Sequence, residues 1–256
     1  MFEAEPVEVR LIRHGETRGY EADLGLTDRG REQALIKGAE LAKALRPGDT
    51  VRLLHAPTAR AAETATALRE GLLAADVVDV PAASVDGSFH NFRLWCDDVA
   101  LDPTQAYASY AAVRDRDGER RPAWYAEIDR FFSIQAAGED PITYWLTQPV
   151  QHFEPAAAAV RRFWHGIVAH VRDAAPGLRV FVATHSGCIR ALAASAFGYD
   201  PGEPENTEDV VIRTSPAATH AQLTYRERTV ELVVPTTATP PWVSPIHEGE
   251  PQDAHR

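Results

Sequence analysis

The sequence has little cysteine, and the two cysteines that it has are far apart. Cys96 and Cys188 are the only ones in 256 residues, and neither belongs to a CxxC pair. A disulfide framework needs more cysteines than this, and dithiol redox chemistry needs a closer spacing. We therefore expect two buried free thiols, and we do not expect redox chemistry.

Basic residues and long apolar runs are also scarce. Asp and Glu number 37 against 26 Lys and Arg, so the formal net charge is −11. Clustered cations drive binding to nucleic acid and to anionic membranes, so the sequence predicts neither partner. No stretch approaches the roughly 18 apolar residues of a membrane span, and the acidic start MFEAEPVEV is unlike a secretory signal. We expect a cytoplasmic protein. If it binds an anion, we expect a local cluster of cations to hold that anion.

What the sequence does contain is typical of a folded α/β chain, with 45% hydrophobic and 25% charged residues. Apolar runs predict strands over 7–12, 51–55, 179–183, 221–225 and 229–234. Caps, prolines and helical periodicity predict helices over 28–46, 58–73, about 155–175 and 186–197. This alternation predicts a three-layer α/β/α sandwich, with a mostly parallel sheet and an antiparallel extension formed by the last two strands.

The segment 85–153 differs from the rest of the chain, because it holds 12 of the 21 aromatic residues without a clear strand. We expect an inserted, mainly helical cap in which most rings form a small second core and some line the mouth of a pocket. We therefore expect one domain over 1–234 that contains this cap. The proline-rich tail over 235–256 is expected to be extended or disordered.

Histidines and arginines follow the ends of three predicted strands. In chain order, these strand-end residues are Arg13, His14, Gly15 and Glu16, then Arg60, then Thr184, His185, Ser186 and Gly187. In open α/β sheets ligands bind outside the carboxyl ends of the strands, so these segments are expected to converge. Arginines beside the N–H groups of helix starts suit a dianionic phosphoryl group. Neighbouring cations would lower the pKa of His14 and keep it nucleophilic, whereas a bound phosphate would favour a protonated His185.

Four motifs in this order, LIRHGET, GLTDRGREQA, HAPTARAAETA and VATHSGCIRAL, resemble the histidine phosphatase superfamily, in the branch that contains the cofactor-dependent phosphoglycerate mutases. The resemblance implies that His14 attacks phosphorus and becomes a phosphohistidine, while Arg13, Arg60 and His185 hold the phosphoryl oxygens. It also implies that no metal or cofactor is needed. Secondary roles follow for three residues: Glu16 orients the pocket, Thr17 donates to the substrate, and Gly187 lets a backbone N–H approach the phosphate.

A leaving alkoxide needs a proton, and in this branch a carboxylic acid downstream of the second arginine supplies it. The segment ASVDGSFHNF offers Asp86 as the best match to the pattern of the family. Glu63, Asp97 and Asp98 are the alternatives. Because Ser186 and Gly187 follow His185, the acid phosphatase branch, in which the proton donor follows that histidine, is disfavoured.

The loop after His14, TRGYEADLGLT, is shorter than in mutases of the family, which favours a phosphatase acting on a small phosphorylated metabolite. Phosphoglycerate mutase, protein-tyrosine phosphatase and a non-catalytic phosphate-binding module remain open alternatives. A metal hydrolase is disfavoured, because the ten histidines form no HxH or HExxH spacing. The sequence does not determine the oligomeric state, and a homodimer is one of the open arrangements.

Overall fold

A seven-stranded sheet forms the centre of the protein. The computed structural model describes residues 6–116, 120–172 and 174–235, so the predicted tail lies almost wholly outside the described residues. Within these residues the sheet has the strand order β3-β2-β6-β1-β7-β8-β9. Its strands are β1 (Val7–Arg13), β2 (Thr50–His55), β3 (Ser84–Val85), β6 (Leu178–Thr184), β7 (Asp209–Thr214), β8 (His220–Tyr225) and β9 (Arg228–Val233).

The sheet is mixed and largely parallel. β3, β2, β6 and β1 run parallel to one another, and β7, β8 and β9 each pair antiparallel with the strand before them in the sheet. The predicted hairpin is therefore part of a longer antiparallel extension. Sequence reasoning missed two strands of this sheet, the two-residue β3 and β7. β7 pairs directly with β1 and alternates between buried and half-buried residues.

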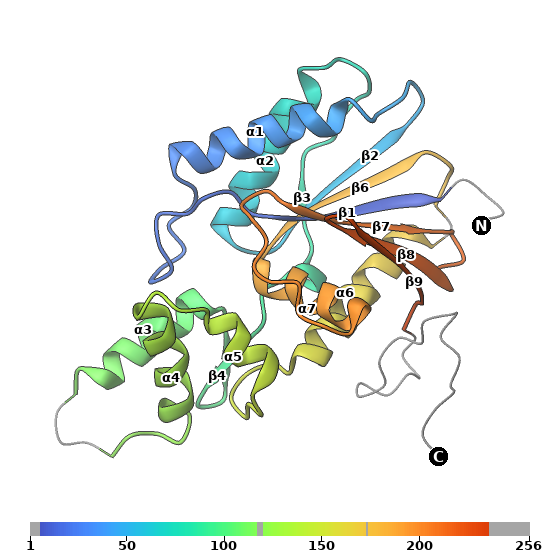
Figure 1. The fold of residues 1–256 in the computed structure, drawn as a ribbon. Helices are drawn as coiled ribbons and strands as arrows, with labels where there is room; N and C mark the ends of the chain where they lie inside the picture. The colour runs from blue at the N-terminus through green and yellow to red at the C-terminus, as the bar shows by residue number, and fades with distance from the viewer. Residues whose placement is uncertain (1–5, 117–119, 173, 236–256) are drawn as a thin grey trace, which may run out of the picture.

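Helices cover both faces of the sheet, as predicted (Figure 1). α1 (Asp28–Ala42) and α2 (Ala59–Leu73) lie on one face, and α6 (Ala156–Val171) and α7 (Ser186–Phe197) lie on the other. Alternate residues of β6 serve the two layers: Val180 and Val182 belong to the core beneath α6 and α7, whereas Phe181 and Ala183 belong to the core beneath α1 and α2. The predicted α/β fold is confirmed.

Glycines allow α1 and α2 to pack with their backbones close together. A Cβ on Gly38 would lie 2.3 Å from the carbonyl oxygen of Leu68, and one on Gly71 would lie 2.2 Å from that of Leu35. Thr27 caps α1 and accepts a hydrogen bond from the N–H of Gly30, as its place in the sequence predicts. These helices are therefore fixed over the edge of the sheet that carries His14.

The segment between β3 and α6 forms a cap at one end of the sheet (Figure 1). It contains a short 3₁₀ helix, η1 (Gly87–Phe89), the hairpin β4 (Leu94–Cys96) and β5 (Val99–Leu101), and the helices α3 (Pro103–Arg114), α4 (Tyr125–Ala136) and α5 (Pro141–Thr147). The hairpin was not predicted. No helix among the described residues is long and apolar enough to cross a membrane.

Most rings of the cap pack against each other. Phe92 stacks on Trp145 with ring centroids 4.3 Å apart, and Phe131 lies 5.4 Å from Phe153. Of the twelve aromatic residues in this segment, three line the cavity beside His14 and His185: Phe92, Phe131 and Phe132. The cap therefore has the second core that its composition predicts, and one face of this core is open to the site described below.

Candidate active site

Two histidines meet at the carboxyl edge of the sheet. β1 and β6 are parallel neighbours in a register that pairs Arg13 with Thr184, so His14 and His185 follow side by side. Their ring centroids are 5.5 Å apart, and the side chains are almost completely buried. Arg60 enters the same place from the first turn of α2 and is 2% exposed. The structure thus brings together the three segments that the sequence predicted to converge.

The surroundings of His14 favour a neutral imidazole with one free nitrogen. Its Nδ1 lies 2.8 Å from the carbonyl oxygen of Gly15, so Nδ1–H donates and Nε2 carries the lone pair. Burial, and then the positive charges of Arg60 and Arg13, lower the pKa of His14 to about 3. Because an unprotonated imidazole is the nucleophilic form, His14 is prepared for attack at neutral pH.

The backbone around His14 is held tightly. A Cβ on Gly15 would lie 2.3 Å from the carbonyl oxygen of Gly30, so only glycine fits there without a shift of the backbone. The N–H of Gly15 donates to the hydroxyl of Thr64 at 3.1 Å. The amide of Asn206 donates to the carbonyl oxygen of His14 at the same distance, 3.1 Å. The position of the imidazole therefore depends on α1, α2 and the loop before β7.

His185 begins α7, and the capping hydroxyl of α2 holds its ring. Its Nε2 lies 3.1 Å from the hydroxyl oxygen of Thr58. Burial, followed by the positive charge of Arg60, lowers the pKa of His185 well below its usual value. Thr58 was predicted only as part of a helix start, although a threonine just before a helix is a recognisable capping signal.

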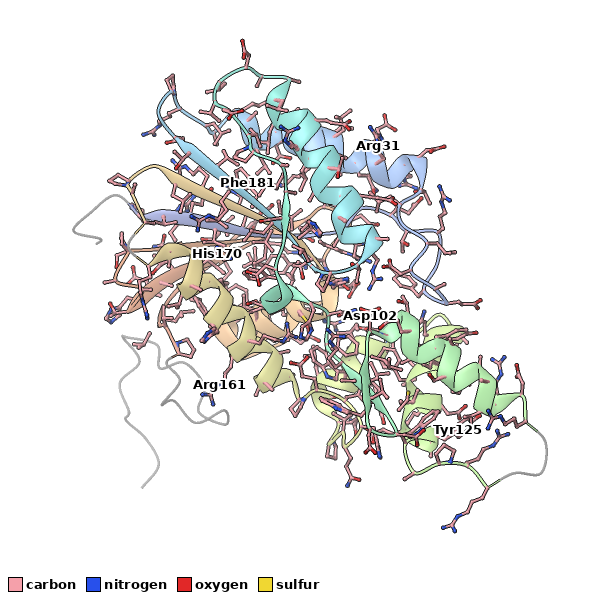
Figure 2. The ribbon with its side chains drawn as sticks, turned by 180° about the vertical axis from the view of Figure 1, so that it is seen from behind. Arg31, Asp102, Tyr125, Arg161, His170 and Phe181 are labelled. Atoms are coloured by element: carbon pink, nitrogen blue, oxygen red, sulfur yellow. The ribbon has the colours of Figure 1, made fainter. Side chains whose placement is uncertain are left out.

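Carboxylates on both sides fix Arg60. One terminal nitrogen lies 3.1 Å from Asp23 in the loop after His14, and the other lies 3.3 Å from Asp102 at the start of the cap helix α3. Asp102 also caps α3, together with Gln105 in a capping box. Figure 2 shows Asp102 on the part of the cap nearest α2. Sequence reasoning missed both carboxylates, although the capping box is visible as DPTQ.

Arg13 lies beside the cavity rather than on its wall. Its guanidinium donates to the carbonyl oxygen of Pro204, lies 3.0 Å from a carboxylate oxygen of Glu203, and donates to the hydroxyl of Tyr20 at 3.3 Å. Tyr20 and Glu203 do line the cavity. Arg13 therefore holds two wall residues that the sequence did not single out as site residues.

Three buried polar atoms near the histidines have no hydrogen-bond partner. They are Nε of Arg13, Nε of Arg60 and Nδ1 of His185, and among the described side chains no other buried nitrogen or oxygen is in this state. An arginine Nε is always a donor, and a buried donor without an acceptor costs about 1–3 kcal/mol. The Nε–H groups of the two arginines are therefore donors that an oxyanion can accept from, and Nδ1 of His185 is a third donor when it carries a proton.

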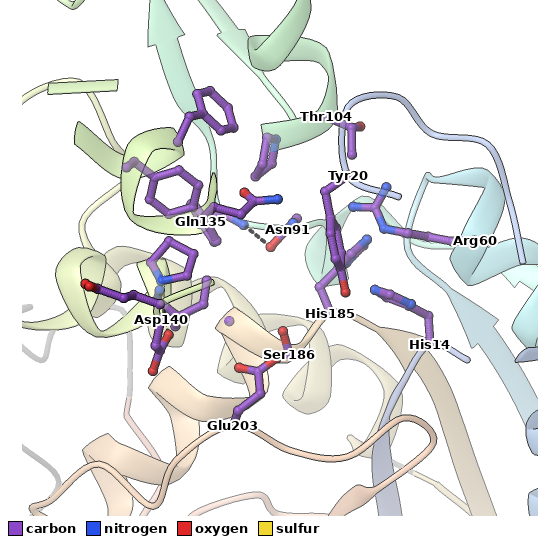
Figure 3. Close-up of a pocket in the computed structure, with 18 residues that line it drawn as sticks. His14, Tyr20, Arg60, Asn91, Thr104, Gln135, Asp140, His185, Ser186 and Glu203 are labelled. Carbon is purple, nitrogen blue, oxygen red and sulfur yellow. Dashed lines mark hydrogen bonds between the residues drawn. The ribbon is translucent and has the colours of Figure 1, made fainter. Parts of the chain in front are cut away.

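A cavity of about 380 Å³ opens from this cluster toward the cap. Figure 3 shows His14, His185, Arg60 and Tyr20 on one side, and Gln135 and Asp140 on the other. Ser186 and Gly187, at the start of α7, line it between these ends. A Cβ on Gly187 would lie 3.0 Å from the ring of Phe92, so this glycine brings the helix start close to the cap.

Two residues expected to act in the pocket have other contacts. The hydroxyl of Thr17 donates to the carbonyl oxygen of Gly25 at 2.8 Å, within its own loop. The carboxylate of Glu16 accepts from the hydroxyl of Thr27 at 2.8 Å and lies 3.4 Å from Arg29. Neither side chain lines the cavity. Glu16 supports the start of α1 rather than the arginines of the pocket.

The structure does not bring Asp86 to the cavity, which corrects the choice of proton donor. Its carboxylate lies 2.6 Å from Nε2 of His170 on α6 and caps the 3₁₀ helix through the N–H of Ser88. Hydrogen bonds from His170 and Ser88 outweigh burial and lower the pKa of Asp86. Figure 2 shows His170 on α6 and Asp102 on a separate element, at the start of α3.

The alternative donors are also outside the residues that line the cavity. Glu63 accepts from the N–H of Leu26 at 2.7 Å, Asp97 accepts from the indole of Trp124 at 3.0 Å, and Asp98 is exposed. Three other carboxyl groups line it: Glu139, Asp140 and Glu203. Two of these belong to the cap region, where the sequence shows no family pattern to identify them.

The fold and the site define an α/β protein with two histidines and two arginines at the carboxyl edge of its sheet. Residues 9–81 match the family model of the histidine phosphatase superfamily (branch 1). The search of curated proteins found no match. Within the described residues, no three His, Cys, Asp or Glu side chains lie together as a metal site would require.

Solved structures with the same fold include two mycobacterial proteins. The structure of mycobacterial hydrolase 1 has a TM-score of 0.50 and 19% identity, and the match covers 80% of this chain and 91% of that one. A mycobacterial glucosyl-3-phosphoglycerate phosphatase in complex with VO₃ has a TM-score of 0.50 and 18% identity, with 87% and 98% covered. At these identities the likeness concerns the fold.

Proposed function

We propose that the protein is a metal-independent phosphomonoesterase that hydrolyses a small phosphorylated metabolite through a phosphohistidine on His14. The observation that carries the proposal is that Arg60 and His185, two residues of the cavity wall, each have an unpaired buried nitrogen beside an imidazole whose Nε2 is free. A phosphoryl group supplies the missing acceptors and the electrophile together. The match of residues 9–81 to the histidine phosphatase family model supports the same proposal.

In this mechanism Nε2 of His14 attacks phosphorus in line with the leaving oxygen. The hydrogen bond from Nδ1–H to Gly15 stabilises the imidazole as it gains positive charge. Arg60, fixed by Asp23 and Asp102, is already oriented when charge spreads over the phosphoryl oxygens. Water then attacks the phosphohistidine and regenerates the free imidazole.

The leaving oxygen takes up a proton in the first step, and a carboxyl group that lines the cavity is the natural donor. Arg190 lies 2.6 Å from Asp140, and its hydrogen bond lowers the pKa of Asp140 against the effect of burial. Glu139 and Glu203 are the remaining donors on the wall. Asp140→Asn, Glu139→Gln and Glu203→Gln each replace one candidate donor by its amide. The variant that lacks the donor should lose turnover of alkyl phosphates about 10²-fold. It should keep most turnover of p-nitrophenyl phosphate, whose leaving group needs little protonation.

The central test is His14→Ala, with release of inorganic phosphate from p-nitrophenyl phosphate as the assay. Turnover should be abolished, and no acid-labile phosphoryl-enzyme should form. Arg60→Ala should lower kcat/KM by about 10²-fold or more, because a charge-assisted contact is lost in a buried site. Wild-type rates for His14→Ala would refute the mechanism.

A phosphoglycerate mutase is the second candidate, because it would use the same histidine chemistry. The short loop after His14 and the single Arg among the described residues lining the cavity disfavour it. Conversion of 3-phosphoglycerate to 2-phosphoglycerate without phosphate release would establish the mutase and overturn the phosphatase.

A further inference from the structure

The end of the cavity away from the histidines is mainly apolar. Phe92, Phe131 and Phe132 line it together with Ile142 and Pro141 of α5. These side chains come from three different parts of the cap, so they surround the space rather than flank it on one side. At about 380 Å³ the cavity is large enough for a phosphoryl group and one ring-sized substituent.

The aromatic wall is held in place by the core behind it. Phe92 is stacked on Trp145 at 4.3 Å, and Phe132 meets the ring of Tyr107 edge-on at 5.1 Å. Phe131 contacts Phe92 at a centroid distance of 5.9 Å. Because each ring packs on another, the wall is a preformed surface that offers offset or edge-on contacts to a further ring.

No Lys or Arg among the described residues lines the apolar end of the cavity. Arg60, the single Lys or Arg among the described wall residues, lies at the histidine end and is already paired with Asp23 and Asp102. Glu139 adds an exposed carboxylate to the wall. A leaving group with its own carboxylate or second phosphate would therefore lose hydration without gaining an ion pair.

We propose that the leaving group of the substrate is a neutral or cationic aromatic alcohol, whose ring lies against Phe92, Phe131 and Phe132. This proposal rests on the proposed function, since it assigns the phosphoryl group to the His14 end. It excludes phosphoglycerates and other substrates with a second anionic group as preferred substrates.

The test compares alkyl phosphates of similar leaving-group basicity, so that the ring and not the chemistry decides the result. We expect kcat/KM for 2-phenylethyl phosphate to exceed that for ethyl phosphate by on the order of 30-fold, through burial of the ring. It should exceed the value for 3-phosphoglycerate by at least as much. Equal rates with 2-phenylethyl and ethyl phosphate, or faster turnover of 3-phosphoglycerate, would overturn the proposal.

Binding of phosphonates separates this proposal from the proposed function. Calorimetry should show that 3-phenylpropylphosphonate, which cannot be hydrolysed at the P–C bond, binds the wild-type protein more tightly than propylphosphonate. Tighter binding of 3-phenylpropylphosphonate without turnover of any phosphate would support the aromatic site and refute the phosphatase activity. Turnover of phosphates without this binding preference would support the phosphatase activity and refute the aromatic site.

Three variants locate the effect. Phe132→Leu keeps an apolar side chain against Tyr107 and should reduce the preference for the ring several-fold. Gln135→Lys places a cation on the wall and should raise kcat/KM for 3-phosphoglycerate relative to 2-phenylethyl phosphate by roughly five-fold. Ser133→Lys, on the exposed face of the same helix, is the matched control and should leave that ratio unchanged. Equal ratios in Gln135→Lys and Ser133→Lys would argue against the proposed position of the leaving group.

Discussion

Acidification tests the buried neutral histidines directly, because it changes stability whether or not a substrate is known. The pKa of His14 falls from an ordinary 6.5 to about 3 in the folded protein. Between these values the unfolded chain binds a proton that the folded chain excludes, so the stability of the fold decreases as pH falls through this window. Well above pH 6.5 the imidazole of His14 is neutral in both the folded and the unfolded chain, so no stability is lost through this residue.

The size of the effect follows from the two pKa values of His14. At pH 5 the unfolded imidazole is almost completely protonated and the folded one is not, which costs about 2 kcal/mol relative to pH 8. The pKa of His185 is lowered as well, so this residue adds a loss of the same sign. Wild-type protein should therefore lose more than the amount due to His14 alone.

Urea unfolding at pH 8 and pH 5 measures this loss. His14→Gln, in which the amide can still donate to Gly15, should lose about 2 kcal/mol less than wild type between the two pH values. His165→Gln removes an exposed histidine and should keep the wild-type pH dependence. If His14→Gln and wild type lose equal stability on acidification, the imidazole of His14 is not a buried neutral base and the electrostatic argument fails.

Three further substitutions test individual contacts. Asp86→Asn should keep kcat/KM within about two-fold and lower the free energy of unfolding by ~1 kcal/mol, because Asp86 pairs with His170 outside the cavity; a 10²-fold loss of activity would restore it as the proton donor. Thr58→Ala should cost about 1 kcal/mol of stability by removing the cap of α2, and it should lower kcat because the hydroxyl contacts His185. Thr58→Ser should retain the stability and the kcat of the wild type. Equal kcat in the two variants would show that the hydroxyl does not hold His185. Gly15→Ala should lower the thermal midpoint by at least 10 °C and abolish turnover, since the new Cβ meets backbone; normal melting would show that the loop can shift.

The proton donor shows why the site could be predicted only in part. Asp86 is the best match to the family pattern, but its carboxylate turns toward its own 3₁₀ helix and toward His170, 84 residues away in the chain. Asp23 and Asp102 pair with Arg60 across 37 and 42 residues. Such pairings depend on how the cap and the loop after His14 pack, and no local pattern encodes this packing.

Five of the seven strands of the sheet, the four helices that cover it and the convergence of His14, Arg60 and His185 were determined by the sequence itself. Hydrophobic periodicity and helix caps act over a few residues, and parallel strands necessarily bring their carboxyl ends to one edge. Only the tertiary structure decided the antiparallel place of β7 beside β1, the fixed orientation of Arg60 and the wall of the cavity. These features arise from contacts between distant segments, where the energy of packing and ion pairing depends on the fold as a whole.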